Sequence, residues 1–432
     1  MHTLSQLRSG QLQGIRRLDL SDGLTTFPRE IFDLADTLEV LNLSGNTLTS
    51  LPDDLPRLHR LRVVFCSGNP FTELPAVLGQ CAQLEMVGFK SCQIRVVPPA
   101  ALPPRLRWLI LTDNHITTLP AEIGQCQQLQ KLMLAGNQLA QLPPALAQCQ
   151  QLELLRFSAN PLADAGTLPD WLLQLPRLAW LARAGTPQVP ASGNAIRWSD
   201  LALQHRLGEG ASGVIHQAEW QGEPVAVKLF KGEVTSDGWP QSELAACLAV
   251  SAHPHLIATL GPLAAHPDGT AGLVMPCIPP HFTTLAGPPS LETCTRDVYP
   301  AGTVFSLSTV LRIAQGVAAA AAHLHASGLL HGDLYAHNLQ CNADGHCLLG
   351  DMGAASFLPA DVAQAQALQR LEVRAFGCLL EELLAHCPEK STDLSLLRND
   401  CLQTAVALRP LFAQILQRLH STELHKDLAD AP

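Results

Sequence analysis

The sequence predicts an α/β solenoid of stacked repeats, followed by a second domain of mixed α and β structure. The chain has 432 residues, enough for two or three folding units at roughly 150 residues per domain. A repeat of about 23 residues runs to about residue 187, and unrelated motifs replace it from Trp198 onward. We therefore expect a repeat domain at 1–187, a linker rich in glycine and proline at 188–197, and a second domain at 198–432.

Composition narrows the class of protein. The chain has 28 Lys and Arg against 38 Asp and Glu, and its net charge is −10. This balance argues against nucleic acid as the main partner, because phosphate binding depends on clustered basic side chains. The cysteine count of 13 is odd in a long chain, which favours reduced thiols. No apolar leader opens the sequence, and no stretch approaches the ~18 to 20 apolar residues that span a bilayer, so we expect a cytoplasmic protein with no membrane span.

The repeats share one pattern and predict one structure. They open at Ile15, Leu38, Leu61, Leu84, Leu106, Leu129, Leu152 and Leu178. The period and the string L-x-x-L-x-L-x-x-N-x-L are typical of leucine-rich repeats. Within each repeat, residues such as Leu41 and Leu43 predict a short strand with inward apolar side chains, and successive parallel strands build a curved sheet.

Three further positions recur along the repeats. An asparagine that can satisfy buried backbone groups of the turn occurs at Asn46, Asn69, Asn114, Asn137 and Asn160. A Leu-Pro pair in four repeats predicts extended backbone leading to the convex side. Cys81, Cys126 and Cys149 share a third position, where a small buried side chain fits. The alternative, a metal or disulfide site, is disfavoured because no C-x-x-C pair or neighbouring histidine completes it.

Two repeats are irregular, and the strand face offers a binding surface. The repeat at Leu84 carries Cys92 in place of asparagine, and the repeat at Leu152 gains three residues near Ala163. Such irregular repeats are either caps or loops recruited for binding. On the concave face we expect a protein partner or substrate to contact Glu39, Arg62, Glu85, Arg107, Gln130 and Glu153.

The second domain opens with a glycine-rich string. Gly208 to Val214 reads G-x-G-x-x-G-x-V, and a strand-like V-A-V-K ending at Lys228 follows it. We therefore expect a hairpin over phosphates and not a strand-to-helix turn. From this point the chain resembles the protein kinase family, and more precisely the leucine-rich repeat protein kinases of bacterial type.

Further landmarks carry the resemblance in order along the chain. Glu243 lies in a helical stretch about fifteen residues after Lys228. His331-Gly332-Asp333-Leu334 with Asn338 resembles the catalytic loop of the family, and Asp351-Met352-Gly353 resembles its D-F-G motif. Arg409-Pro410 opens a closing R-P-x-F signature. The resemblance implies an α+β bilobal protein kinase-like fold that uses ATP and Mg²⁺.

The resemblance also assigns the site residues. Asp333 would accept the substrate's hydroxyl proton, with Lys228 and Asn338 as the other catalytic residues, and Asn338 and Asp351 would bind Mg²⁺. The residues implied for ATP binding are Gly208, Gly210, Ser212, Gly213, Val214, Lys228, Glu243 and Met275. Glu233 is an alternative to Glu243, and His331 is better explained as a packed histidine that supports the loop.

Several residues depart from the family pattern. Tyr335 stands where the usual lysine follows the catalytic aspartate, and His337 occupies the other position known for a cation. Gly332 replaces an arginine that would pair with a phosphate on the activation segment. That segment is short and lacks A-P-E, Glu372 replaces the usual aspartate, and residues 276–305 expand the hinge region.

The sequence thus favours an ATP-dependent protein kinase that transfers the γ-phosphate to a protein hydroxyl, with Ser or Thr as the favoured acceptor. The repeats would then recognise the partner. The alternative is a pseudokinase scaffold that binds protein, with or without ATP, and transfers no phosphate. Tyr335 and the short activation segment favour that alternative, whereas the retained Lys228, Asp333, Asn338 and Asp351 favour the enzyme. A phosphotransferase acting on small molecules is a third hypothesis, but it leaves the repeats unexplained.

Overall fold

The computed structural model describes residues 1–164, 167–186, 194–210, 212–232 and 234–429. The chain divides into two compact units, Met1–Ala165 and Gly166–Pro432. The first holds six whole predicted repeats and the start of the seventh, and the second holds the end of the seventh, the eighth and the predicted second domain. Most of the predicted linker, residues 188–193, lies outside the described residues.

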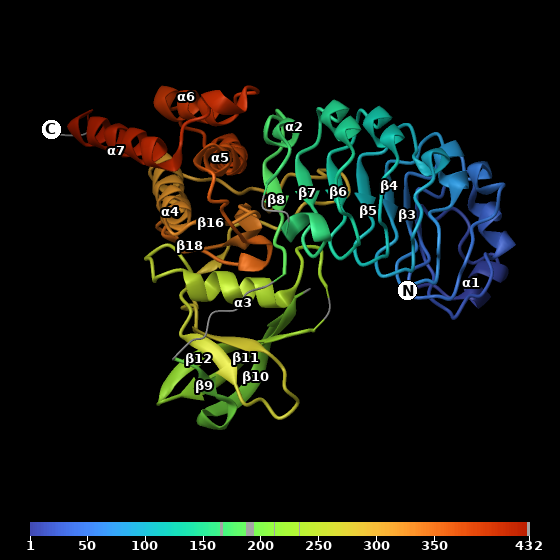
Figure 1. Ribbon diagram of the computed structural model, residues 1–432, viewed down its shortest axis with the longest axis horizontal. Coiled ribbons are helices and arrows are strands. Elements are labelled where there is room, and N and C mark those ends of the chain that lie inside the picture. Colours follow the sequence, from blue (N-terminus) through green and yellow to red (C-terminus); the bar gives the residue numbers. More distant parts are fainter. Residues whose placement is uncertain (165–166, 187–193, 211, 233, 430–432) are drawn as a thin grey trace. The chain divides into compact units, whose positions relative to one another are not determined.

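The first unit is a parallel sheet built from three-residue strands. Each strand pairs with the next in register, so that Leu18 lies opposite Leu41 and Leu41 opposite Val64. Figure 1 shows the strands stacked one after another along the unit. They are β1 (Arg17–Asp19), β2 (Val40–Asn42), β3 (Val63–Phe65), β4 (Met86–Gly88), β5 (Trp108–Ile110), β6 (Lys131–Met133) and β7 (Leu154–Arg156).

Each strand is followed, across a turn, by a short helical segment. A five-residue helix, α1 (Leu4–Arg8), precedes the first strand, and its N-cap Thr3 forms a capping box with Gln6. The later segments are 3₁₀ helices, at Arg29–Leu34, Leu55–Arg57, Ala76–Gln80, Pro99–Ala101, Ala121–Gln125, Pro144–Gln148 and Pro161–Asp164. Pro75, Pro120 and Pro143 precede three of them with extended backbone, as the Leu-Pro pairs predict.

The recurring asparagines form the buried ladder that the pattern predicts. Asn114 is 4% exposed; its Nδ2 donates to Phe89 O at 2.8 Å and to Leu111 O at 3.0 Å, while Ile94 N donates to its Oδ1 at 3.0 Å. Asn69 and Asn137 donate in the same way to the carbonyls of their own and the preceding repeat. One side chain thus links three backbone groups that water cannot reach.

The repeat cysteines are buried small side chains, as predicted. Burial raises the pKa of Cys81 and Cys126 to about 11 and that of Cys149 to about 12, so these thiols stay protonated. Cys92, at the asparagine position, reaches the Cys66 carbonyl with its Sγ at 3.5 Å. A thiol is a weak donor, so this repeat makes a weaker version of the same contact.

The second unit begins with the end of the repeat that opens at Leu152 and with the last repeat, which opens at Leu178; we call residues 170–183 the terminal repeat. It contains α2 (Asp170–Leu173) and β8 (Trp180–Ala182). The predicted boundary at residue 187 places this repeat in the first domain, whereas the compact unit that contains it is the second. Ile196–Arg197, predicted as linker, forms β9 and pairs with β13 in the sheet of the second unit, because the Ile196 side chain completes an apolar core there.

A six-stranded sheet and one helix form the N-terminal lobe of this unit. The strand order is β10-β11-β12-β14-β13-β9, and β10 to β12 run antiparallel. The core between the strands includes Val225, Val227 and Val274. The elements are β10 (Leu201–Glu209), β11 (Gly213–Trp220), β12 (Glu223–Phe230), α3 (Pro240–Ala249), β13 (Gly261–Ala264) and β14 (Gly272–Pro276).

The C-terminal lobe is mainly helical. Its helices are α4 (Leu307–Ala326), α5 (Val362–Ala385), α6 (Thr392–Cys401) and α7 (Phe412–Ala429), and its short strands are β15 (Thr283–Thr284), β16 (Leu329–Leu330), β17 (Leu339–Cys341), β18 (Cys347–Leu349) and β19 (Ser356–Phe357). Among the described residues, α4 alone is long and apolar enough to cross a membrane by length and composition. It packs against α5 and α7, and ten of its residues between Val310 and Leu324 are buried, as in a core helix.

One finding differs from the expectation of reduced thiols. Cys341 and Cys347 form a disulfide across the β17–β18 hairpin, with Cα atoms 4.1 Å apart. The hairpin register makes them a directly opposed pair, a relation that the linear spacing of cysteines does not reveal. With this exception the predicted fold is confirmed: an α/β repeat solenoid followed by an α+β bilobal domain.

Candidate active site

The glycine-rich string forms the predicted hairpin between β10 and β11. Gly210 N donates to Gly213 O at 2.9 Å, and Lys231 N donates to Ser212 O at 3.0 Å, which ties the turn to β12. A Cβ atom on Gly213 would lie 2.5 Å from Leu229 O, so only glycine fits there. Gly208, Gly210, Ser212 and Gly213 line a cavity of about 790 Å³, whereas Val214, on β11, is not among the residues that line it.

Lys228 and Glu243 form a buried ion pair beside this hairpin. The register of β12 places Lys228 opposite Ile215 and Leu273, and α3 presents Glu243 to it, with Nζ and Oε1 2.5 Å apart. Burial raises the pKa of Glu243, and the nearby charge of Asp351 adds to the rise, while Lys228 opposes it. The predicted partner of Lys228 is therefore in place; the alternative, Glu233, lies outside the described residues.

The catalytic-loop motif forms a tight, internally bonded turn. Asn338 Nδ2 donates to Asp333 O at 2.8 Å and to Asp333 Oδ2 at 3.1 Å, so the two side chains lie together. His331 is fully buried: its Nδ1 accepts from Asp333 N, and its Nε2–H donates to Gly350 O at 2.8 Å. His331 thus supports the loop, as predicted.

Asp351 is held close to this loop by the backbone. Gly350 N donates to Asn338 O at 3.0 Å, and Asp351 follows with φ of 53°, a left-handed conformation in which its Oδ1 accepts from Gly353 N at 3.2 Å. Asp351 lines the same cavity as Lys228 and Glu243. The structure therefore brings the predicted lysine, glutamate and metal-binding aspartate to one cavity, with Asp333 and Asn338 at the adjoining loop.

The donor set suits a magnesium ion that phosphate oxygens also hold. Both short bonds of Asn338 use its Nδ2, which leaves Oδ1 as an acceptor, and Asp351 adds a carboxylate. Among the described residues, no group of three His, Cys, Asp or Glu side chains could form a metal site by itself. Mg²⁺ is commonly bound by one or two protein oxygens together with substrate phosphates, so the residues present fit this ion.

The cavity has the size of a small-molecule site. Its volume lies within the roughly 300 to 1,000 Å³ range of small-molecule sites. Met275 and Pro276, at the end of β14, line the cavity together with Cys247 and Ile257. Met275, predicted for the ATP site, is among the residues that line this cavity.

His337, one of the departures from the family pattern, pairs with an aspartate of the hinge region. His337 Nδ1 lies 2.7 Å from Asp297 Oδ1, and His337 N donates to Asp297 Oδ2 at 2.9 Å. Burial lowers the pKa of His337, but the hydrogen bond and charge of Asp297, with Asp333 and Asp351 nearby, outweigh it and leave this pKa raised. Asp297 belongs to the expanded hinge region. Its role was not predicted, because no motif distinguishes it from any other aspartate in a loop.

Glu372, which replaces the usual aspartate of the family, is buried and bonded to the catalytic loop. It is 3% exposed; its Oε1 accepts from Gly332 N at 2.6 Å, and its Oε2 lies 2.7 Å from His325 Nε2. Burial tends to raise the pKa of Glu372, but its hydrogen bonds and the charges of His325 and His331 lower it overall. The catalytic loop is therefore anchored to α5 by a buried carboxylate.

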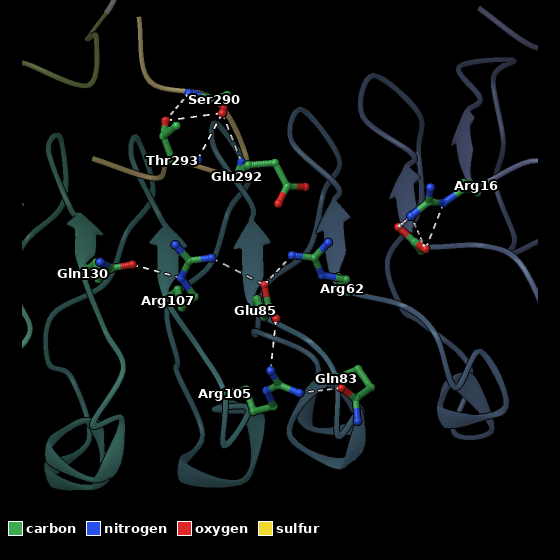
Figure 2. A network of polar contacts seen from close by, with 11 residues as sticks. Arg16, Arg62, Gln83, Glu85, Arg105, Arg107, Gln130, Ser290, Glu292 and Thr293 are labelled. Carbon is green, nitrogen blue, oxygen red and sulfur yellow. Dashed lines mark hydrogen bonds and ion pairs between the residues drawn. The ribbon is translucent and has the colours of Figure 1, made fainter. Parts of the chain in front are cut away.

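In the first unit, four of the predicted concave residues, Arg62, Glu85, Arg107 and Gln130, form a row of polar contacts (Figure 2). Glu85 accepts from Arg62 Nη2 at 3.0 Å and lies 3.7 Å from Arg107 Nη1, and Arg107 Nε donates to Gln130 at 2.9 Å. Glu39 pairs with Arg16 at 2.7 Å, and Glu153 directly precedes β7. Charges of both signs therefore alternate along the strands, and the face is not uniformly acidic or basic.

Comparison with known proteins agrees with this geometry. Residues 201–383 match the family model described as protein tyrosine and serine/threonine kinase, and residues 104–162 and 37–58 match leucine rich repeat models. The chain carries leucine-rich repeats and a protein kinase domain. Among the relatives of the kinase domain and its flanks are both serine/threonine and tyrosine kinases by name.

The relatives are distant. A probable serine/threonine-protein kinase of Dictyostelium discoideum is 28% identical over 159 residues, 37% of this chain and 9% of the relative. The megakaryocyte-associated tyrosine-protein kinase of Mus musculus is 25% identical over 284 residues, 56% of this chain and 53% of the relative. The serine/threonine-protein kinase mos of Xenopus laevis is 26% identical over 185 residues, 42% of this chain and 46% of the relative. The chain thus spans about half, or much less, of these relatives.

Proposed function

We propose that the kinase domain is an active, ATP-dependent protein kinase that phosphorylates Ser or Thr hydroxyls of a protein substrate. The observation that carries this proposal is the buried Lys228–Glu243 pair, which lines the same cavity as Asp351. Phosphoryl transfer in protein kinases needs both the lysine–glutamate pair and the metal-binding aspartate in place. The Lys228–Glu243 pair is formed and Asp351 lines the same cavity, which supports an active enzyme.

Each residue then has a defined task. Lys228, steadied by Glu243, would neutralise the α- and β-phosphates, and the amides of the glycine hairpin would cover them. Mg²⁺, held by Asn338 and Asp351, would offset the charge on the phosphates. Asp333, oriented by its bonds to Asn338, would accept the hydroxyl proton of the substrate.

The pseudokinase alternative rests on Tyr335 and the short activation segment. The pair of His337 and Asp297 weakens it, because a raised pKa favours an imidazolium ion in the loop that lacks the usual lysine. We therefore favour the enzyme. The preference for Ser and Thr over Tyr, the bacterial type of the resemblance and the cytoplasmic location belong to the same proposal.

For the repeats we propose recognition of a protein partner on the concave face. The alternating charges of Arg62, Glu85 and Arg107 favour a partner that carries both signs, and the acidic chain disfavours nucleic acid. The proposal that leucine-rich repeats bind protein rests on the fold, and the alternating charges indicate what kind of protein surface would fit.

The deciding experiment is the transfer of labelled phosphate from γ-labelled ATP, with Mg²⁺, to the full chain itself and to a generic protein acceptor. Asp333→Asn should lower incorporation by at least about 100-fold, the effect of removing a general base. Asp344→Asn, a matched change at an exposed aspartate of the β17–β18 turn, should leave incorporation unchanged. Equal incorporation by wild type and Asp333→Asn would refute the proposal, and phosphoamino-acid analysis would identify the acceptor hydroxyl.

A further inference from the structure

The terminal repeat contacts the catalytic loop through one tryptophan. The Trp180 ring stacks on Tyr335, with centroids 4.2 Å apart and planes 4° from parallel. Trp180 Nε1–H donates to Leu334 O at 2.9 Å, and Trp180 is 1% exposed. Leu334 and Tyr335 directly follow Asp333, so the tryptophan holds both the side chain and the backbone next to the residue that would accept the proton.

Gly332, which directly precedes Asp333, lies against the same repeat. Its φ is +77°, and a Cβ atom there would lie 2.5 Å from Ala354 O and 2.7 Å from Leu181 O. Any larger residue would therefore displace β8 or the segment after Asp351. Two of the departures from the family pattern, Gly332 and Tyr335, thus lie against the terminal repeat.

The same repeat also holds the segment that follows Asp351. Arg183 Nη1 donates to Phe357 O at 2.9 Å, and Arg183 is 7% exposed. Phe357 belongs to β19, which pairs with β16 just before His331. A guanidinium bonded to a backbone carbonyl therefore orders this segment without any phosphate.

Two further arginines fix the repeat to the C-terminal lobe. Arg409 Nη2 donates to Pro176 O at 2.7 Å, and Arg374 Nε donates to Arg177 O at 3.1 Å. Both guanidinium groups are buried, on α5 and at the R-P-x-F signature. The terminal repeat is consequently anchored on both sides of Trp180, which gives that ring a defined position over the loop.

We propose that Trp180 is a positioning residue for Asp333, and that the terminal repeat orders the catalytic loop and activation segment in place of an activation-segment phosphate. This inference rests on the proposed kinase function. The bonds that run from Trp180 to Leu334 and Tyr335 set the peptide that carries Asp333, and with Gly332 the loop has no arginine to pair with a phosphate. Phosphoryl transfer is then independent of activation-segment phosphorylation.

The test compares kcat and KM of the full chain with changes at two tryptophans of the same repeat. Trp180→Ala should lower kcat between about 10- and 100-fold, the scale of a small misplacement of reacting groups. KM for ATP should stay within about twofold, because Trp180 does not line the nucleotide cavity. Trp171→Ala, at a half-buried tryptophan on α2, should leave kcat unchanged.

Trp180→Phe tests whether a loss of activity in Trp180→Ala reflects only a folding defect. Phenylalanine keeps a ring over Tyr335 but loses the hydrogen bond to Leu334 O, so this variant should keep the wild-type Tm within a few degrees and recover part of kcat. Phosphatase treatment should leave wild-type activity unchanged. Wild-type kcat in a folded Trp180→Ala or Trp180→Phe protein would overturn the positioning role, and loss of activity on dephosphorylation would overturn the replacement of the phosphate.

Hydrogen exchange separates this inference from the proposed function. In Trp180→Phe, amides of residues 331–339 should exchange faster than in wild type, whereas Trp171→Ala should match wild type. If wild type transfers no phosphate above Asp333→Asn, the proposed function fails, and exchange alone then decides whether Trp180 orders the loop. Unchanged exchange at 331–339 would refute the inference even in an active enzyme.

Discussion

The repeat unit and the kinase domain satisfy their buried polar groups in different ways. In the repeat unit, one asparagine position serves the same backbone groups again and again, as Asn69 and Asn114 show. In the kinase domain each buried group has its own partner: Glu372 takes Gly332 and His325, and Lys228 takes Glu243. Loss of one contact should therefore weaken one repeat locally, whereas in the kinase domain it should also change the site. Four substitutions test this contrast, in order of expected effect.

Glu372→Gln should produce the largest loss of stability. Removing the charge from a buried, hydrogen-bonded carboxylate costs about 3 to 5 kcal/mol. Because the pKa of Glu372 is lowered by folding, its contribution is complete above its ordinary value of 4.5 and is lost as the pH falls through the folded-state pKa. Urea denaturation should therefore show a penalty at pH 7 that shrinks below pH 4.5. Glu381→Gln, at an exposed glutamate of α5, is the control, and equal effects of the two changes would contradict this account.

Gly332→Ala should be the next most damaging change. The left-handed backbone costs about 1 kcal/mol for a residue with a Cβ, and the contacts with two carbonyls raise the expected loss to about 3 kcal/mol. Gly328→Ala has nearly the same φ, +78°, but meets no atom within 4 Å, so it should lose only about 1 kcal/mol. Thermal denaturation of both variants measures the difference. Equal losses would show that Leu181 does not limit the space at residue 332.

Asn114→Ala should destabilise the repeat unit by about 2 kcal/mol, because it leaves buried backbone groups without a hydrogen bond. Phosphate transfer should stay unchanged, since the site lies in the other unit. Thr117→Ala, at an exposed residue of the same repeat, should stay within about 0.5 kcal/mol of wild type. Hydrogen exchange of the repeats measures the effect, and an Asn114→Ala protein as stable as Thr117→Ala would break the ladder argument.

Cys92→Asn should give the smallest effect and the opposite sign. An amide at this position would replace a weak thiol contact to the Cys66 carbonyl by a stronger hydrogen bond, which should add about 1 kcal/mol of stability. Cys92→Ala, which removes the contact, should be slightly less stable than wild type. A Cys92→Asn protein that is less stable than wild type would mean that the irregular repeat no longer accommodates the ladder.

The contrast also explains what could be predicted from the sequence. The asparagine ladder could be predicted because the same residue recurs at one position in five repeats. Lys228, Glu243, Asn338 and Asp351 could be predicted because their spacings match the motifs of the family. The contact of Trp180 with Leu334 joins residues 154 apart in sequence, and no spacing rule relates them. Asp297 is equally hidden, in a loop of the expanded hinge. In the sequence, the departures Gly332, Tyr335 and His337 were the only sign that residues from elsewhere in the chain contact the catalytic loop.

The most direct test of the central claim, that nucleotide chemistry takes place in the cavity of the kinase domain, is hydrogen exchange of the full chain with and without ATP and Mg²⁺. The account predicts protection of amides at Gly208, Gly210, Ser212 and Gly213 and in residues 275–278 and 350–352, which line that cavity. Lys228→Met should abolish this protection, whereas Lys390→Met, at an exposed lysine just before α6, should retain it. Unchanged exchange of all three segments in the wild-type protein would contradict the account.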